Sequence, residues 1–223
     1  MINEPNAELR ESDPDVGLLT VLREDGTADP ATDPRLPHAT LLSAYRHMRR
    51  LRLLDARMIV LQRQGRVGFY GACTGQEAVP IAAGLVANEH DWVFPALREQ
   101  SVMLVRGFPL RDFVAQVFGN SADILKGRQM PSHQSGRRVQ QVSWSSCIGP
   151  QIPQAVGAAW AMKLKKDSAI AFGFTGDGAT SQPDFHAAMN FAAVFEVPCV
   201  LVCQNNQWSI SVPTSRQTAS KTI

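Results

Sequence analysis

Two short apolar segments, each ending in a polar motif, constrain the fold of this chain more than any other feature. Residues 168–175 read SAIAFGFT and lead into Gly-Asp-Gly, and residues 197–204 read VPCVLVCQ and lead into Asn-Asn. Continuous apolar runs of this length are typical of strands that are buried on both faces of a parallel sheet. The residues between them predict one helix, so we interpret the segment as a strand–helix–strand unit of an α/β fold.

The helix between the two strands has a recognisable start. Ser181 to Asp184 read SQPD, which matches a capping box with a proline in the first helical turn. The helix is expected to run to about Phe195. Its inward face is expected to carry Phe185, Met189 and Ala192 or Ala193.

The two polar motifs are expected to meet. A right-handed crossover makes the strands parallel, so Asp177 and Asn206 leave the same edge of the sheet, where open α/β sheets bind ligands. A carboxylate, an amide oxygen and a nearby backbone carbonyl suit Mg²⁺, which shares its shell with phosphate oxygens. The glycines admit a diphosphate to backbone N–H groups, and the helix N-terminus adds positive potential. Taken alone, GDG is explained as a plain turn and NN as a plain strand exit. Taken together, the two motifs predict a Mg²⁺–diphosphate site.

The rest of the chain divides into an arm and one domain. Residues 1–37 are rich in Pro, Asp and Glu and predict an extended arm that includes a short strand in VGLLTVL, and residues 38–223 predict the domain. Further elements are expected as a helix at 41–62, a strand at 91–96, a helix at 101–118 with a break near 107–109, a polar loop at 119–149 and a helix at 150–166.

Composition excludes several classes of protein. The chain has 223 residues, 44% of them hydrophobic and 19% charged, with a net charge of +2, which favours neither nucleic acid nor a membrane as partner. No apolar run approaches the roughly 18–20 residues that span a bilayer. Five acidic residues among the first fifteen are unlike a secretory or mitochondrial presequence, so we expect a cytoplasmic protein. The four cysteines are expected to be buried, reduced thiols, because Cys199 and Cys203 would lie roughly 13 Å apart on one strand.

Several segments along the chain indicate which protein family it resembles. In chain order they read RQGRVGFYGACTGQEA, LREQSVMLVRGFPL, KGRQMPSH, QIPQAVGAA, GDGATSQPDFHAAMNFAAVF and QNNQWSISVPTSRQTASKT. A GDG followed after 26 residues by NN resembles the thiamine diphosphate motif. Over residues 15–223 the chain resembles the alpha subunit of the thiamine-dependent component of 2-oxo acid dehydrogenase complexes. KGRQMPSH is more similar to the branched-chain (2-oxoisovalerate) enzymes, whereas GFYGACTGQE and RQTASKT are equally similar to bacterial pyruvate dehydrogenases.

The resemblance implies a parallel-sheet thiamine diphosphate-binding fold and a set of site residues. Asp177, Asn206 and the backbone carbonyl of Trp208 would hold Mg²⁺. The cofactor contacts would come from the backbone of Gly178 and Ala179 at the diphosphate, from Arg98 at a phosphate, and from Ser146 and Ile148 at the aminopyrimidine.

The resemblance also implies an activity and partners. The activity is oxidative decarboxylation of a 2-oxo acid by an oxidoreductase with a disulfide acceptor, with the acyl group passing to a lipoyl group of the acyltransferase core. A branched-chain 2-oxo acid is favoured over pyruvate. A beta subunit would supply the other half of the site, in an α₂β₂ heterotetramer.

Three departures from the family pattern change these expectations. Leu97 stands where an aromatic residue, often tyrosine, is usual, so a phosphate-binding hydroxyl is absent. Cys147 and Pro150 stand in a loop that binds K⁺ in some branched-chain members, and proline offers no hydroxyl, which argues against K⁺. The chain stops at Ile223, so we expect the C-terminal part of the domain to be missing unless a separate alpha polypeptide supplies it. A truncated, non-catalytic fragment that only docks on the beta subunit is the alternative.

No catalytic residue is assigned. His133, in MPSH, is interpreted as a surface or hydrogen-bonding residue rather than a catalytic base. Glu77, in GQEA, is expected to serve at a helix start, because the glutamate that activates the aminopyrimidine comes from the beta subunit in this family. A nicotinamide-binding Rossmann protein is disfavoured, because no GxGxxG follows a strand.

Overall fold

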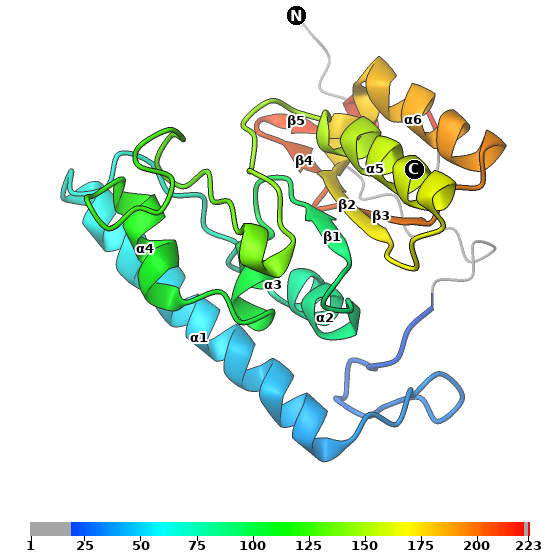
Figure 1. Ribbon diagram of the computed structural model, residues 1–223. Helices are drawn as coiled ribbons and strands as arrows, with labels where there is room; N and C mark the ends of the chain where they lie inside the picture. Colours follow the sequence, from blue (N-terminus) through cyan, green and yellow to red (C-terminus); the bar gives the residue numbers. More distant parts are fainter. Residues whose placement is uncertain (1–18, 221–222) are drawn as a thin grey trace, which may run out of the picture.

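The computed structural model describes residues 19–220 and residue 223, so the first part of VGLLTVL lies outside the described residues. In the described part of that segment, Leu22 forms only an isolated bridge with Ala28. The helices are α1 (His38–Arg63), α2 (Ala78–Val86), α3 (Gln100–Val105), α4 (Leu110–Phe118), α5 (Gln151–Lys165) and α6 (Pro183–Val194). The strands are β1 (Trp92–Phe94), β2 (Ala171–Gly176), β3 (Cys199–Gln204), β4 (Trp208–Ser209) and β5 (Val212–Pro213) (Figure 1).

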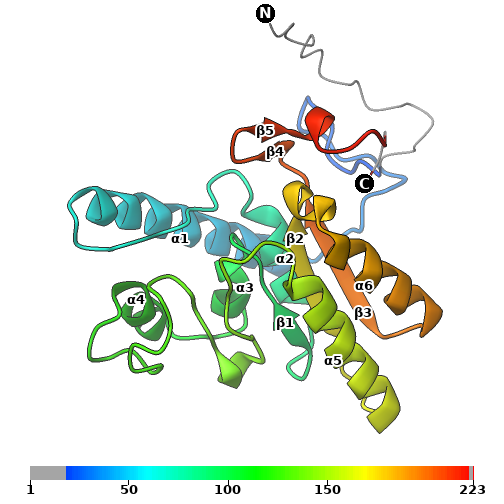
Figure 2. The same ribbon diagram turned by 90° about the horizontal axis from the view of Figure 1, so that it is seen from above.

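The expected parallel α/β architecture is confirmed. β1, β2 and β3 form a sheet in that order, and both pairs of neighbours are parallel. In the register of the second pair, Gly176 lies opposite Gln204, so Asp177 and Asn206 begin beyond the same edge. Figure 2 shows β4 and β5 close to the ends of β2 and β3, where they form a separate antiparallel pair.

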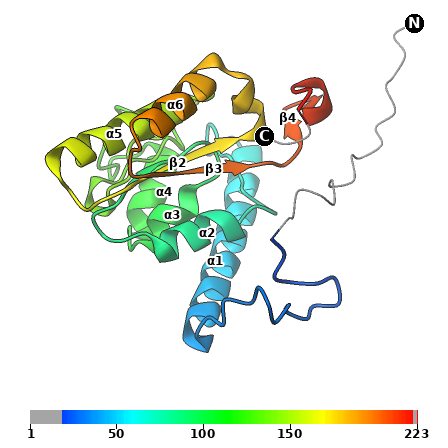
Figure 3. The ribbon, with the colours of Figure 1, turned by 90° about the vertical axis from the view of Figure 1, so that its right-hand side faces the viewer.

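Helices cover both faces of the sheet. Figure 3 shows α5 and α6 on one side and α2 and α3 on the other. Ala171 packs with α5 and α6, whereas Phe172 and Phe174 pack with residues of α2 and α3, as the alternation of side chains along a strand requires. Gly173 belongs to the α5 face, where a Cβ would lie 2.9 Å from that of Ala155, so its lack of a side chain lets the helix approach the sheet.

The outer part of the sheet is less buried than expected. β3 was expected to be buried on both faces, but within the described residues it pairs only with β2, and only Gln204 is buried along it. Val200 is 42% exposed as a result. Met189 of α6 is also exposed, and Ala188 is the buried residue of that helix, because α6 lies over the outer part of the sheet where β3 leaves it little surface to cover.

The start of α6 also differs from expectation. Gln182 occupies the N-cap position, with Pro183 as the first helical residue, and no side chain caps the helix. Ser181 instead ends a turn of 3-10 helix at Asp177–Ser181 that directly follows β2. The capping box is therefore wrong, and one extra turn, which begins within the GDG motif, lies between β2 and α6.

The other elements agree more closely with the sequence. The expected helix at 41–62 is α1, and the break near Gly107 separates α3 from α4. All four cysteines are free thiols as expected, but Cys147 and Cys203 are exposed rather than buried. No helix among residues 19–220 is long and apolar enough to cross a membrane.

The exposed side of β3 leads to a prediction about self-association. An edge strand with exposed apolar side chains can pair with another chain, and a lysine on such a strand opposes pairing. We expect Val200→Lys to lower the self-association of the isolated chain, measured by sedimentation velocity at increasing concentration. Gln64→Lys adds the same charge at the end of α1, remote from β3 in Figure 1, and is expected to have no effect. Equal association of Val200→Lys and the unmodified chain would contradict the prediction.

Candidate functional site

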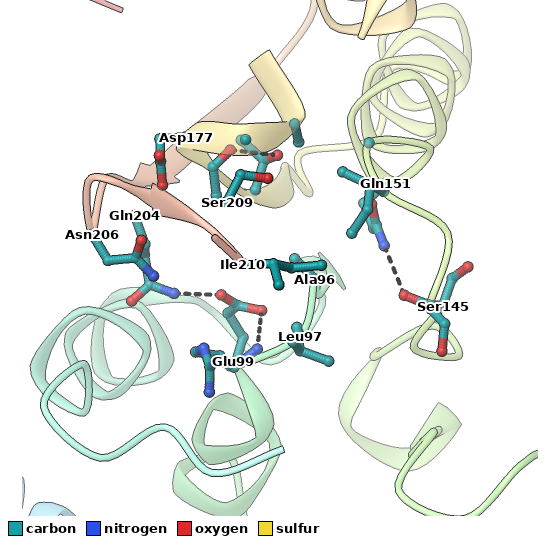
Figure 4. Close-up of a pocket in the computed structure, with 18 of the residues that line it drawn as sticks. Ala96, Leu97, Glu99, Ser145, Gln151, Asp177, Gln204, Asn206, Ser209 and Ile210 are labelled. Atoms are coloured by element: carbon teal, nitrogen blue, oxygen red, sulfur yellow. Dashed lines mark hydrogen bonds between the residues drawn. The ribbon is translucent and has the colours of Figure 1, made fainter. Parts of the chain in front are cut away.

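A cavity of about 390 Å³ opens at the carboxyl edge of the sheet. Segments that follow all three strands line it: residues 96–99 after β1, residues 177–179 after β2, and residues 206 and 208–210 after β3. The fourth wall is the loop 145–149, which leads into α5. Figure 4 shows Asp177 and Asn206 on one side of the cavity, with Ser145 and Gln151 on the other. This is where parallel α/β sheets bind ligands.

The residues singled out from the sequence come together here. The lining includes Arg98, Ser146, Ile148, Asp177, Gly178, Ala179, Asn206 and Trp208. They come from four segments that are up to 110 residues apart in the sequence.

Asp177 is a buried acid of the cavity, with 2% of its surface exposed. Its Oδ2 accepts hydrogen bonds from Thr214 Oγ1 at 2.9 Å and from Gln217 Nε2 at 3.5 Å. A carboxylate has about four lone-pair positions, so these bonds leave acceptor capacity, mainly on Oδ1. Thr214 and Gln217 follow β5, which means that the chain returns over the GDG motif and orients its carboxylate.

Gly178 lies directly beneath this returning segment. A Cβ at position 178 would lie 2.6 Å from the Cβ of Ser209, closer than real side chains approach one another. The glycine therefore has a steric role, because it lets β4 approach the end of β2.

Asn206 is exposed, unlike Asp177. Its Oδ1 accepts the backbone N–H of Trp208 at 2.9 Å, which closes a turn of the kind that asparagine side chains commonly make. The second lone pair of this amide oxygen remains available to a ligand. The indole of Trp208 is 56% exposed, so the residue faces solvent as well as the cavity.

Arg98 is tied to the glycine-rich loop 71–76. Its guanidinium donates to the carbonyl of Ala72, and the neighbouring Gln100 Nε2 donates to the carbonyl of Gly71 at 2.6 Å. A guanidinium has five N–H donors, so Arg98 keeps donors for a ligand in the cavity.

A buried carboxylate of α1 holds the same loop. Asp55 accepts hydrogen bonds from the Tyr70 hydroxyl at 2.7 Å and from the Cys73 backbone N–H at 2.8 Å. Burial, followed by the charge of Asp55, raises the pKa of the Tyr70 hydroxyl and of the Cys73 thiol, so both stay neutral. Asp55 of α1 therefore anchors the loop, and the loop in turn holds Arg98.

Glu77 has the role expected at a helix start. It occupies the N-cap position of α2, where its carboxylate accepts the backbone N–H of Gly75 at 2.9 Å and pairs with Arg52. The hydrogen bond from Arg52 lowers the pKa of Glu77.

Glu99 is a cavity residue that the sequence reasoning missed. Its side chain is buried, with Oε1 accepting from Gln204 Nε2 and Oε2 accepting from the backbone N–H of Arg98 at 3.0 Å (Figure 4). Desolvation is the main cause that raises the pKa of this carboxyl to about 7, against the opposing effect of its hydrogen bonds. The contact joins the ends of β1 and β3. Glutamate beside Arg98 is visible in the sequence, but its burial depends on β3, more than a hundred residues later.

The donor set of the cavity fits a divalent cation only in combination with an anion. Among the described residues, no three His, Cys, Asp or Glu side chains gather in a group that could hold a metal. Asp177 and Asn206 together offer one charge and two hard oxygens, which is fewer than the six ligands that Mg²⁺ requires. Arg98, which also lines the cavity, adds a positive charge. The arrangement therefore suits a cation that is bound through a phosphate-bearing ligand.

Comparison with known proteins gives a consistent picture. The family model of the dehydrogenase E1 component matches residues 45–223. The chain is 46% identical to the 2-oxoisovalerate dehydrogenase subunit alpha 2, mitochondrial, of Arabidopsis thaliana over 173 aligned residues. The aligned residues make up 78% of this chain and 37% of that protein. It is 42% identical over 200 residues to the 2-oxoisovalerate dehydrogenase subunit alpha of Pseudomonas aeruginosa, and the alignment covers 90% of this chain and 49% of that protein. The human mitochondrial 2-oxoisovalerate dehydrogenase subunit alpha is 40% identical over 195 residues, and the alignment covers 87% of this chain and 44% of that protein. The chain spans less than half the length of these relatives.

The buried carboxyl of Glu99 predicts a pH dependence of stability. Its pKa is about 7 in the folded chain and 4.5 in the unfolded one, so the folded state binds more protons between these values. The free energy of unfolding should therefore fall by about 3 kcal/mol as the pH rises through this window. Glu99→Gln should flatten this part of the curve, measured by urea unfolding between pH 4.5 and 8. Glu89→Gln, at an exposed carboxylate, should leave it unchanged, and a parallel curve for Glu99→Gln would contradict the prediction.

Proposed function

The chain belongs to the dehydrogenase E1 component family, and on that premise we propose that it is an alpha subunit that holds Mg²⁺–thiamine diphosphate in a 2-oxo acid dehydrogenase. The observation that carries the proposal is the cavity itself. The GDG motif, the NN motif, Arg98 and the loop 145–149 reach its wall from four separate segments. The proposal concerns the activity of a whole enzyme, of whose alpha-subunit relatives this chain spans less than half.

In this proposal, the Mg²⁺ ligands of the chain are Asp177, Asn206 and the backbone carbonyl of Trp208. The hydrogen bond from Thr214 supports the assignment of Asp177, because metal-binding carboxylates are usually oriented by such partners. The turn closed by Asn206 supports the assignment of the Trp208 carbonyl, because the hydrogen bond in this turn keeps Asn206 and Trp208 together. The diphosphate would supply the remaining anionic oxygens.

The diphosphate would lie between the GDG motif and Arg98. Backbone N–H groups of Gly178 and Ala179 supply neutral donors, and the guanidinium of Arg98 supplies the positive charge. Leu97 also lines the cavity and brings an apolar side chain there, so Arg98 would be the phosphate-binding side chain of this segment. A side chain at Gly178 would weaken binding sterically, because it would clash with Ser209. Loss of Arg98 would weaken binding electrostatically, because it removes the positive charge.

Ser146 and Ile148 would face the aminopyrimidine of the cofactor across the cavity. We do not propose K⁺ in this loop. Pro150 offers no hydroxyl there, and Gln151 Nε2 holds the loop by donating to the carbonyls of Ser145 and Cys147, at 3.3 Å each.

When bound, thiamine diphosphate supplies the carbanion-stabilising chemistry by which a 2-oxo acid loses CO₂. The chain's own residues would bind and orient it. The names of the relatives favour a branched-chain 2-oxo acid over pyruvate as substrate. The proposed partners are a beta subunit, in an α₂β₂ assembly, and the lipoyl-bearing acyltransferase core that accepts the acyl group.

The metal assignment predicts the effect of one substitution. Asp177→Asn removes the only side-chain charge in the proposed shell, so it should weaken Mg²⁺-dependent binding of thiamine diphosphate about tenfold or more, measured by calorimetry on the alpha–beta assembly. Asn206→Ala removes a neutral ligand and should act in the same direction but less strongly. Asp184→Asn removes an exposed carboxylate on α6 and is the matched control. Unchanged affinity in Asp177→Asn would refute the assignment.

The activity predicts a substrate preference. We expect the chain, co-expressed with a beta subunit, to decarboxylate 3-methyl-2-oxobutanoate faster than pyruvate in the presence of Mg²⁺ and thiamine diphosphate. The measurement is kcat/KM for each 2-oxo acid. An assembled complex that binds the cofactor but turns over neither acid would instead favour a non-catalytic docking role.

A further inference from the structure

The contact between His133 and Ser146 has no part in the function proposed so far. Ser146 lies on the cavity wall, in the loop that leads into α5, and its side chain is exposed to the cavity. His133 lies behind it and is 5% exposed. One imidazole nitrogen, Nε2, is within hydrogen-bond distance of Ser146 Oγ, and the other, Nδ1, lies 3.0 Å from the carbonyl oxygen of Pro131.

These two partners determine where the hydrogens are. The carbonyl of Pro131 can only accept, so Nδ1 must carry the N–H that faces it. A neutral imidazole has a single N–H, which leaves Nε2 as an acceptor. The hydroxyl of Ser146 must then be the donor in its contact with His133.

The imidazole is held firmly in this orientation. Its ring centroid lies 5.0 Å from that of Trp144 and 6.3 Å from that of Phe69. Ser132 Oγ donates to the carbonyl of Phe69 at 2.6 Å, which ties the loop of His133 to the opposite wall of its pocket. The direction of the Ser146 hydroxyl is therefore set by the packing around His133.

The consequence is a polarity on the cavity wall. Because its hydrogen points toward His133, Ser146 presents only oxygen lone pairs to the cavity. We propose that His133 is a positioning residue that makes Ser146 an obligate hydrogen-bond acceptor, so that the cavity selects a ligand with an N–H donor at this point over one with a carbonyl oxygen. For the identity of the ligand, this inference rests on the proposed function, since the aminopyrimidine of thiamine diphosphate carries an amino group.

A pair of cofactors that differ in this group tests the selection. Oxythiamine diphosphate has an oxo group where thiamine diphosphate has the amino group. The ratio of the two dissociation constants is measured with Mg²⁺ on the full chain assembled with a beta subunit. Other contacts contribute to the ratio, so the change between variants is the informative quantity.

The variants separate polarity from shape. His133→Phe keeps a ring but removes the acceptor, which frees the Ser146 hydroxyl to donate, and should reduce the preference for the amino cofactor about tenfold. His133→Gln retains an acceptor near the position of Nε2 and should keep the preference. Adding Ser146→Ala to His133→Phe should not restore it. A His133→Phe variant that weakens both cofactors equally would overturn the proposal and leave His133 a purely structural residue.

A second measurement does not depend on cofactor binding. The chain has five histidines, and ¹⁵N NMR of ring-labelled protein distinguishes their tautomers, with His133→Gln identifying the signal. We expect the neutral tautomer with the hydrogen on Nδ1. The opposite tautomer, or an imidazolium at neutral pH, would overturn the proposal. If the expected tautomer is found but neither cofactor binds, the proposed function fails while the orientation of Ser146 stands.

Discussion

The parallel alignment of β1, β2 and β3 is the constraint on which the site depends. It brings three strand ends to one edge, although the chain leaves that edge at widely separated positions. Polar residues that follow apolar strands thereby become neighbours without any local sequence relation between them. The packing beneath them supports this arrangement, because Gly173 lets α5 lie close to the sheet and brings the loop 145–149 to the fourth wall.

A set of buried polar contacts then fixes the side chains around the cavity. Glu99 and Gln204 join the ends of β1 and β3, and Thr214 orients Asp177 from the returning segment. Asp55 anchors the glycine-rich loop on which Arg98 rests. Each contact joins elements that are distant in sequence, so the cavity is preorganised by the fold rather than by local turns. The buried carboxylate of Asp177 and the guanidinium of Arg98 suit a ligand that combines a cation with phosphate.

The sequence predicted what depends on local pattern and chain direction. Two apolar runs with GDG and NN at their ends were sufficient for the parallel pair and for the meeting of Asp177 and Asn206 at one edge. Properties that depend on distant neighbours were not predictable in this way. The exposure of Val200 and Met189 depends on how many strands lie beside β3, and the burial of Glu99 depends on Gln204. The capping box failed because the chain inserts a 3-10 turn after β2 before α6 begins.

The central claim is that the cation and the phosphate-bearing ligand complete each other's binding site, since the chain offers too few ligands for the cation alone. Reciprocal coupling of two ligands is measurable as a change in affinity. Calorimetric titration of thiamine diphosphate into the alpha–beta assembly, with Mg²⁺ present and with Mg²⁺ removed by a chelator, tests this claim most directly. We expect removal of Mg²⁺ to weaken cofactor binding at least about tenfold. Equal affinity under the two conditions would contradict it.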